Sequence, residues 1–151
     1  MNLRQHLLYL LPVFLLFSCG EKHPALKEED AVRAVLTNMW DAIEKKDIDR
    51  YATYIHPDFT QFGETDSVLL IGKSAEVSAI KDWMQHSSNV HTDMHEPRIT
   101  INGQVAWIVY YWSDNGINAG KPFSSRGKST RLFVKENNQW LCIHGHYTLL
   151  P

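Results

Sequence analysis

The chain has 151 residues, of which 44% are hydrophobic and 21% are charged, which is typical of one globular domain with a buried core and not of a disordered chain. Its formal net charge of −2 supplies no basic excess to neutralise phosphates, so we expect no nucleic-acid partner. Two cysteines are too few for a disulfide-based scaffold.

The first residues resemble a bacterial lipoprotein signal peptide. Arg4 precedes an apolar run of about eleven residues, which is too short to span a bilayer core about 30 Å thick. The four residues that end at Cys19 resemble a lipobox, although Phe17 is larger than usual at its position. We therefore predict a signal peptide over residues 1–18, a lipid on Cys19 and a tether over residues 19–27. The alternatives are an ordinary signal peptide and a membrane anchor that is never cleaved.

A lipid on Cys19 implies that the folded part works in the bacterial cell envelope, facing the periplasm or the cell surface. A di- or triacyl group gives stable attachment to a membrane. Cys142 is then the only other thiol, and it lies within an apolar strand pattern. We expect it to be buried and unreactive.

Three helices are predicted in the first part of the folded chain. Apolar residues recur at helical spacing from Val32 to Ile43, with acidic residues before them and lysines after them, which predicts a helix over residues 28–46. Asp47 has the side chain of an N-cap for a short helix over residues 48–55, and Pro57 bars its continuation. A third helix is predicted over residues 74–86.

Strand patterns dominate the remainder of the chain. A short strand is predicted at 59–62, and residues 68–71 form either another short strand or a loop. Alternating apolar residues then predict strands over 91–101, 104–113, 125–136 and 139–149, separated by turns at 102–103, 114–122 and 137–138. Helices followed by an antiparallel meander indicate an α+β domain over residues 28–151, with the helices covering one face of the sheet.

The order of these elements and three motifs resemble the NTF2-like superfamily, within it the SnoaL-like or DUF4440 type. Trp40 and the stretch from Lys46 to Tyr51 are similar to the family's link into its second helix, and the stretch from His56 to Thr60 is similar to its entry into the first strand. The last strand has the pattern W-x-x-x-H-x-H-x-T, which resembles the end of DUF4440 proteins and of the association domain of calmodulin-dependent kinase II.

This resemblance implies a cone made of a strongly bent sheet with helices packed over it. It also implies a homodimer formed through the convex face of the sheet. The strand over 104–113 is apolar on both faces, as expected when one face packs on helices and the other on a second subunit.

We expect the cone to bind a small organic molecule. Strand alternation places His144 and His146 on the same face as Cys142, provided that no bulge intervenes, and Arg131 is a suitable partner for a carboxylate. The predicted ligand-binding residues are aromatic side chains and these three polar ones: Trp40, Tyr54, Tyr111, Arg131, His144 and His146.

Two other functions stay open. One is an isomerase, cyclase or hydratase in which His146 or His144 transfers a proton, because imidazole titrates near neutral pH. Asp58 and Glu64 are the nearest carboxylates to the first strand, but neither lies on a motif that marks it as catalytic. The other function is an oligomeric scaffold without a ligand.

No cofactor or metal is expected. The sequence has no G-x-G-x-x-G or P-loop motif for a nucleotide. His144 and His146, with His91, His95 and Glu96 as further donors, have the chemistry of zinc ligands. Nothing in their spacing brings His91 to His146, so we predict no metal site.

Overall fold

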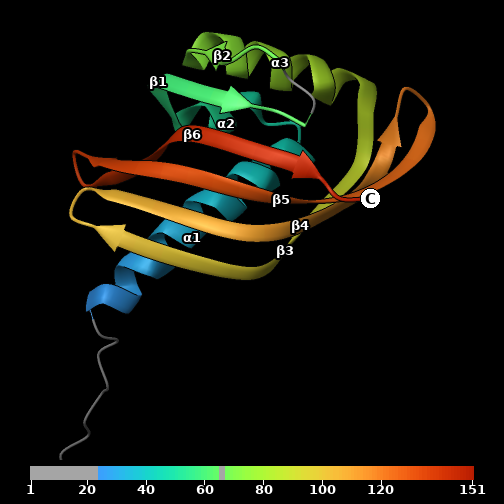
Figure 1. The fold of residues 1–151 in the computed structure, drawn as a ribbon. Helices are drawn as coiled ribbons and strands as arrows, with labels where there is room; N and C mark the ends of the chain where they lie inside the picture. The colour runs from blue at the N-terminus through green and yellow to red at the C-terminus, as the bar shows by residue number, and fades with distance from the viewer. Residues whose placement is uncertain (1–23, 65–66) are drawn as a thin grey trace, which may run out of the picture.

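The computed structural model describes residues 24–64 and 67–151. Within these described residues, three helices and six strands follow one another: α1 (Pro24–Glu44), α2 (Ile48–Thr53), β1 (Ile55–Phe62), β2 (Leu70–Ile71), α3 (Lys73–His86), β3 (Ser87–Asn102), β4 (Val105–Asn118), β5 (Lys121–Glu136) and β6 (Gln139–Leu149). The strands form one bent sheet in the order β2-β1-β6-β5-β4-β3, and α1 lies across one face of it (Figure 1). The predicted α+β fold is confirmed.

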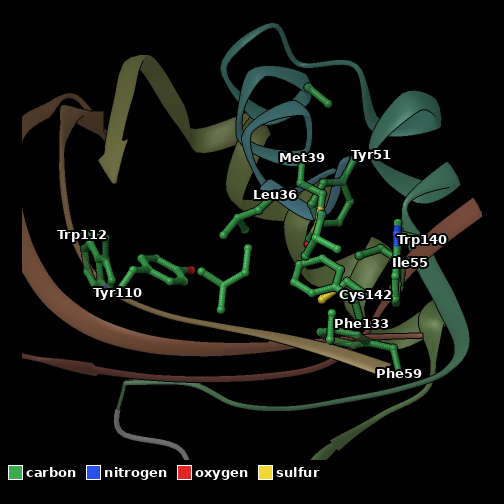
Figure 2. Packing of buried hydrophobic residues seen from close by; sticks show 14 residues of the cluster. Leu36, Met39, Tyr51, Ile55, Phe59, Tyr110, Trp112, Phe133, Trp140 and Cys142 are labelled. Atoms are coloured by element: carbon green, nitrogen blue, oxygen red, sulfur yellow. The ribbon is translucent and has the colours of Figure 1, made fainter. Parts of the chain in front are cut away.

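The helix α1 covers the sheet with the apolar side that its sequence predicts. Val32, Leu36 and Met39 are almost fully buried, because their spacing keeps them on one side of the helix. They pack with residues from β1, β4, β5 and β6 in the core shown in Figure 2. The helix begins at Pro24, where proline is well tolerated, so residues 24–27 of the predicted tether are helical.

The first strand lies beside the last one, although most of the chain separates them. β1 pairs in parallel with β6, so that Thr60 lies opposite His144 and Phe62 opposite His146. All other neighbouring strands run antiparallel. Asp47 caps α2 as predicted, since its side chain accepts a hydrogen bond from the backbone N–H of Arg50 at 3.0 Å. This short helix turns the chain into β1.

The hairpin between β4 and β5 is longer than the sequence predicts. Residues 114–118 continue β4 instead of forming a turn, and the chain reverses at Ala119 and Gly120, which both have positive φ. Asp114 pairs with Ser125 in the ladder. Phe123, near the end of the hairpin, contacts Trp83 of α3 with the ring centroids 6.4 Å apart. Contact with α3 gives the extended strands the tertiary support that their turn-like sequence does not reveal.

One irregularity in β6 decides which side chains face α1. Phe133 pairs with Cys142, but the next residue back on β5, Leu132, pairs with His144, so Ile143 is an extra residue in β6. A bulge of this kind reverses the alternation of the strand beyond it. Cys142 therefore faces the helices, as do Gly145 and Tyr147, whereas His144 and His146 face the opposite side.

Candidate functional site: an aromatic cavity under the helices

A cavity of about 200 Å³ lies between the helices and the inner face of the sheet. Its apolar lining comes from α1, α3 and the long strands, and Figure 2 shows Tyr110 and Trp112 to one side of the main core cluster. Most of the lining residues are aromatic or aliphatic: Trp40, Ile43, Ile80, Trp83, Val90, Tyr110, Trp112 and Tyr147. The other five have polar or charged side chains: Glu64, Thr92, Asp114, Ser129 and Arg131.

Of the predicted ligand-binding residues, Trp40 and Arg131 line this cavity. The Trp40 ring meets Tyr110 edge to face at 5.7 Å between centroids. The Arg131 guanidinium lies 5.7 Å from the centre of the Tyr147 ring, and its Nη1 donates a hydrogen bond of 2.8 Å to Oε1 of Gln61. Gly145 lies opposite Arg131, where a Cβ atom would be 2.3 Å from Nη1. The absence of a side chain at Gly145 thus gives the guanidinium its room.

A buried polar network lies behind Arg131. Tyr51 donates a 2.6 Å hydrogen bond to Glu76, and Nε2 of Gln61 donates one of 3.5 Å to the other Glu76 oxygen. Burial and the neighbouring Glu76 carboxylate raise the pKa of Tyr51 well above its usual value, so the phenol keeps the proton that it donates. The network fixes Gln61, and Gln61 in turn orients Arg131.

A titratable carboxyl group lines the cavity at Asp114. Burial and, after it, the nearby Glu64 carboxylate raise the pKa of Asp114 to about 6, although hydrogen bonds from Ser125 oppose the shift. Glu64, which the sequence analysis gave only as one of the two carboxylates nearest to the first strand, also lines the cavity. Asp58 is exposed and lies outside it.

The prediction that His144 and His146 face the cavity is wrong. The extra residue at Ile143 turns both rings to the outer face of the sheet, the face directed away from α1. Nδ1 of His144 is 2.8 Å from the Thr60 hydroxyl, and the His146 ring is 6.0 Å from that of Phe62. Partial burial, followed by the charges of His146 and Arg131, lowers the pKa of His144. Neither imidazole is therefore in position to exchange protons with a molecule in the cavity.

Two other predicted site residues also lie elsewhere. Tyr111 is 48% exposed and, with His146, lines a separate groove of about 480 Å³ on the outer face. It alternates with Tyr110, and Tyr110 is the residue that faces inward. Tyr54 packs against the edge of the core.

Sequence reasoning missed most of the other cavity residues, among them Trp83, Trp112, Asp114 and Tyr147. The alternation that turns Tyr110 inward extends to Trp112, which lies within the strand predicted over 104–113, and to Asp114, which the turn predicted over 114–122 excluded. Tyr147 faces the cavity because of the bulge at Ile143, which residue alternation alone does not reveal. Cys142 agrees with prediction: it is fully buried, and burial raises the pKa of its thiol to about 11.

The described part of the chain offers no metal centre. No group of three or more His, Cys, Asp or Glu side chains within residues 24–64 and 67–151 is arranged to hold a metal ion. The imidazole of His91 instead faces carboxylates of Glu44 and Asp93, each at 3.4 Å.

Among residues 24–64 and 67–151, no helix is both long and apolar enough to cross a bilayer.

Known proteins resemble this chain in sequence and in fold. It is 27% identical to calcium/calmodulin-dependent protein kinase type II of Caenorhabditis briggsae over 127 residues, which are 83% of this chain and 24% of the kinase. The chain thus spans about a quarter of the length of that curated relative.

Two solved structures share the architecture. A proposed dehydratase of the NTF2-like family from Streptomyces avermitilis superposes with a TM-score of 0.78 at 12% identity, covering 84% of this chain and 99% of that one. The association domain of the C. elegans kinase superposes with a TM-score of 0.65 at 23% identity, covering 82% and 96%. Residues 32–150 match the SnoaL-like domain family, and the chain belongs to that family.

Proposed function

We propose that this protein binds a small organic molecule in the cavity beneath α1, without an assigned reaction. One observation carries the proposal. Within the described residues, five buried side-chain nitrogen or oxygen atoms have no hydrogen-bond partner, and three of them belong to residues that line the cavity: Trp112 Nε1, Asp114 Oδ1 and Arg131 Nε. Buried polar atoms are normally paired, so their concentration around one cavity favours a ligand that completes them.

The lining indicates the chemistry of the ligand. Flat aromatic walls favour an apolar body, as in most small-molecule sites. Burial alone lowers the pKa of Arg131, but titratable neighbours, led by Tyr110, outweigh burial and raise it. Arg131 therefore stays positively charged and offers a forked set of donors, which favours a carboxylate on the ligand.

The test is to identify small molecules that remain bound to the purified full-length chain by mass spectrometry. We expect a reproducible organic acid in the wild type, and about tenfold less of it in Arg131→Lys, which keeps the charge but loses the planar fork. His146→Ala is the matched control, because His146 lies on the outer face, and it should retain the molecule. Equal retention by Arg131→Lys, or no bound molecule together with no binding of added butyrate, would refute the proposal.

We also propose that the domain is tethered to a bacterial membrane through a lipid on Cys19. Cys19 lies outside the described residues, and the support is the apolar run before it and its lipobox-like context. Cys19→Ala should move the protein from the membrane fraction to the soluble fraction, whereas Cys142→Ala should not. Mass spectrometry of the N-terminal peptide should find a diacyl group on the Cys19 sulfur. An unmodified Cys19 in a membrane-bound chain would contradict the anchor.

Self-association through the outer face is a second candidate function. Val105, Val109 and Tyr111 of β4 and Phe62 of β1 are each at least 37% exposed, and all four belong to this face. Exposed apolar side chains gathered on one face of a sheet favour an interface. The likeness to a kinase association domain also supports association. We propose a homodimer in which each copy contributes the same face.

A further inference from the structure

The inner cavity has a negative end. Arg131 pairs with Ile108 on β4, and Asp114 lies six positions further along the same strand (114 − 108 = 6). Glu64, which follows β1, lines the cavity together with Asp114. The two carboxyl groups are near enough for Glu64 to raise the pKa of Asp114. The cavity therefore joins a cationic region at Arg131 to an anionic region at Asp114.

Tryptophan rings surround the anionic end. Trp112 precedes Asp114 by two positions and points to the same face of β4, and Trp83 of α3 also lines the cavity. Trp112 is only 8% exposed, so its ring is largely shielded from water. Faces of tryptophan rings attract organic cations, and the attraction is strongest where water is excluded.

This combination discriminates among ligand groups. An anion would be repelled by both carboxylates. A neutral apolar group would cover the Asp114 oxygen that already lacks a partner and leave it without one, which is unfavourable. An ammonium group would donate hydrogen bonds to the carboxylates, offset their mutual repulsion and contact the tryptophan rings.

We propose that the ligand is an amino carboxylate, an inference that rests on the proposed function of the cavity. Its ammonium group lies between Asp114, Glu64 and the tryptophan rings, and its carboxylate is directed toward Arg131. The two ends of the cavity thus select the two ends of one zwitterionic molecule. Six positions along a strand span about 20 Å, so the spacing between Arg131 and Asp114 favours long amino carboxylates in which many atoms separate the two charges.

The ammonium end is tested separately from the carboxylate end with single-charge probes. Isothermal titration of the full-length chain at pH 7.5 would use n-butylammonium, its neutral isostere n-butanol, and n-butyrate. We expect n-butylammonium to bind about tenfold more tightly than n-butanol, the factor that one charged hydrogen bond contributes. Asp114→Asn should remove this advantage. Asp82→Asn, a carboxylate on α3 outside the cavity, is the matched control and should keep it.

The outcomes separate this inference from the proposed function. Equal affinity for n-butylammonium and n-butanol overturns the ammonium site, and binding of n-butyrate in the same experiment leaves the proposed function standing. Preferential binding of n-butylammonium without n-butyrate supports the ammonium site and counts against the carboxylate end. If Asp114→Asn does not unfold cooperatively, Glu64→Gln replaces it. A Glu64→Gln chain with unchanged preference for the ammonium probe overturns the inference.

Discussion

A buried carboxylate and a partly buried guanidinium shape the interior at the level of single residues. Glu76 is 1% exposed and receives hydrogen bonds from Tyr51 and Gln61, so its carboxylate is solvated by protein groups in place of water. Arg131 is connected to the same group through Gln61. Because the network satisfies Glu76 but leaves Arg131 Nε without a partner in the described chain, the guanidinium is the member of the network that is suited to a ligand.

Asp114 should make stability depend on pH. Its pKa rises on folding from the ordinary value of 3.8 to about 6, so the folded state holds the proton more tightly than the unfolded state. This contribution to stability is fully present below the unfolded pKa and is lost as pH rises through about 6. At pH 8 the ionised carboxyl therefore destabilises the fold.

The corresponding prediction uses Asp114→Asn and urea unfolding. Because Asp114 is only partly buried and solvent screens its charge, we expect the unfolding free energy of the variant at pH 8 to exceed that of the wild type by no more than about 1 kcal/mol. The difference should shrink at pH 5. Asp82→Asn is the control and should change little at either pH. A stabilisation that is the same at both pH values would show that the Asp114 charge is not its cause.

At the level of elements, the bulge in β6 sets the character of both sheet faces. It directs Gly145 and Tyr147 to the cavity and the two histidines to the outer face. The inner surface then has Gly145 where the side chains of Arg131 and Gln61 come closest to the backbone of β6. A Cβ atom at Gly145 would lie 2.3 Å from Nη1 of Arg131 and 2.8 Å from Oε1 of Gln61. A strand without the bulge would place imidazoles where the guanidinium now lies.

Gly145→Ala should therefore destabilise the protein by about 2 kcal/mol, the usual cost of overpacking a filled site. The measurement is urea unfolding, combined with Arg131→Ala in a double-mutant cycle. Because the added methyl group meets the guanidinium first, the cost of Gly145→Ala should be much smaller in the Arg131→Ala background. An equal cost in both backgrounds would mean that the strain arises elsewhere in β6.

Much of the element pattern was predictable because it depends on local spacing. The apolar stripe of α1, the cap at Asp47 and the limits of β6 are properties of short segments. The bulge at Ile143 was not predictable, because it depends on how β6 pairs with β5 and β1. The continuation of β4 through Asp114 depends likewise on a distant partner strand. Trp40 and Arg131 were located correctly, since neither depends on those two irregularities.

At the level of the whole molecule, the apolar outer face should control the oligomeric state. Val109→Lys places a charge at the middle of the proposed interface, and light scattering after size-exclusion chromatography should then give a monomer where the wild type is a dimer. Val68→Lys is the matched control, because Val68 is 76% exposed and lies outside the sheet. A wild-type chain that is already monomeric at micromolar concentration, or a Val109→Lys chain that stays dimeric, would contradict the proposed interface.

The sequence alone determined the α+β class, the helical face that covers the sheet and the buried state of Cys142, because these follow from the period and polarity of consecutive residues. Tertiary structure decided which polar groups meet in the cavity. A single extra residue in β6 reverses the direction of every later side chain in that strand, and only strand pairing reveals it. The cavity therefore contains Arg131, Asp114 and Glu64 in place of the two histidines.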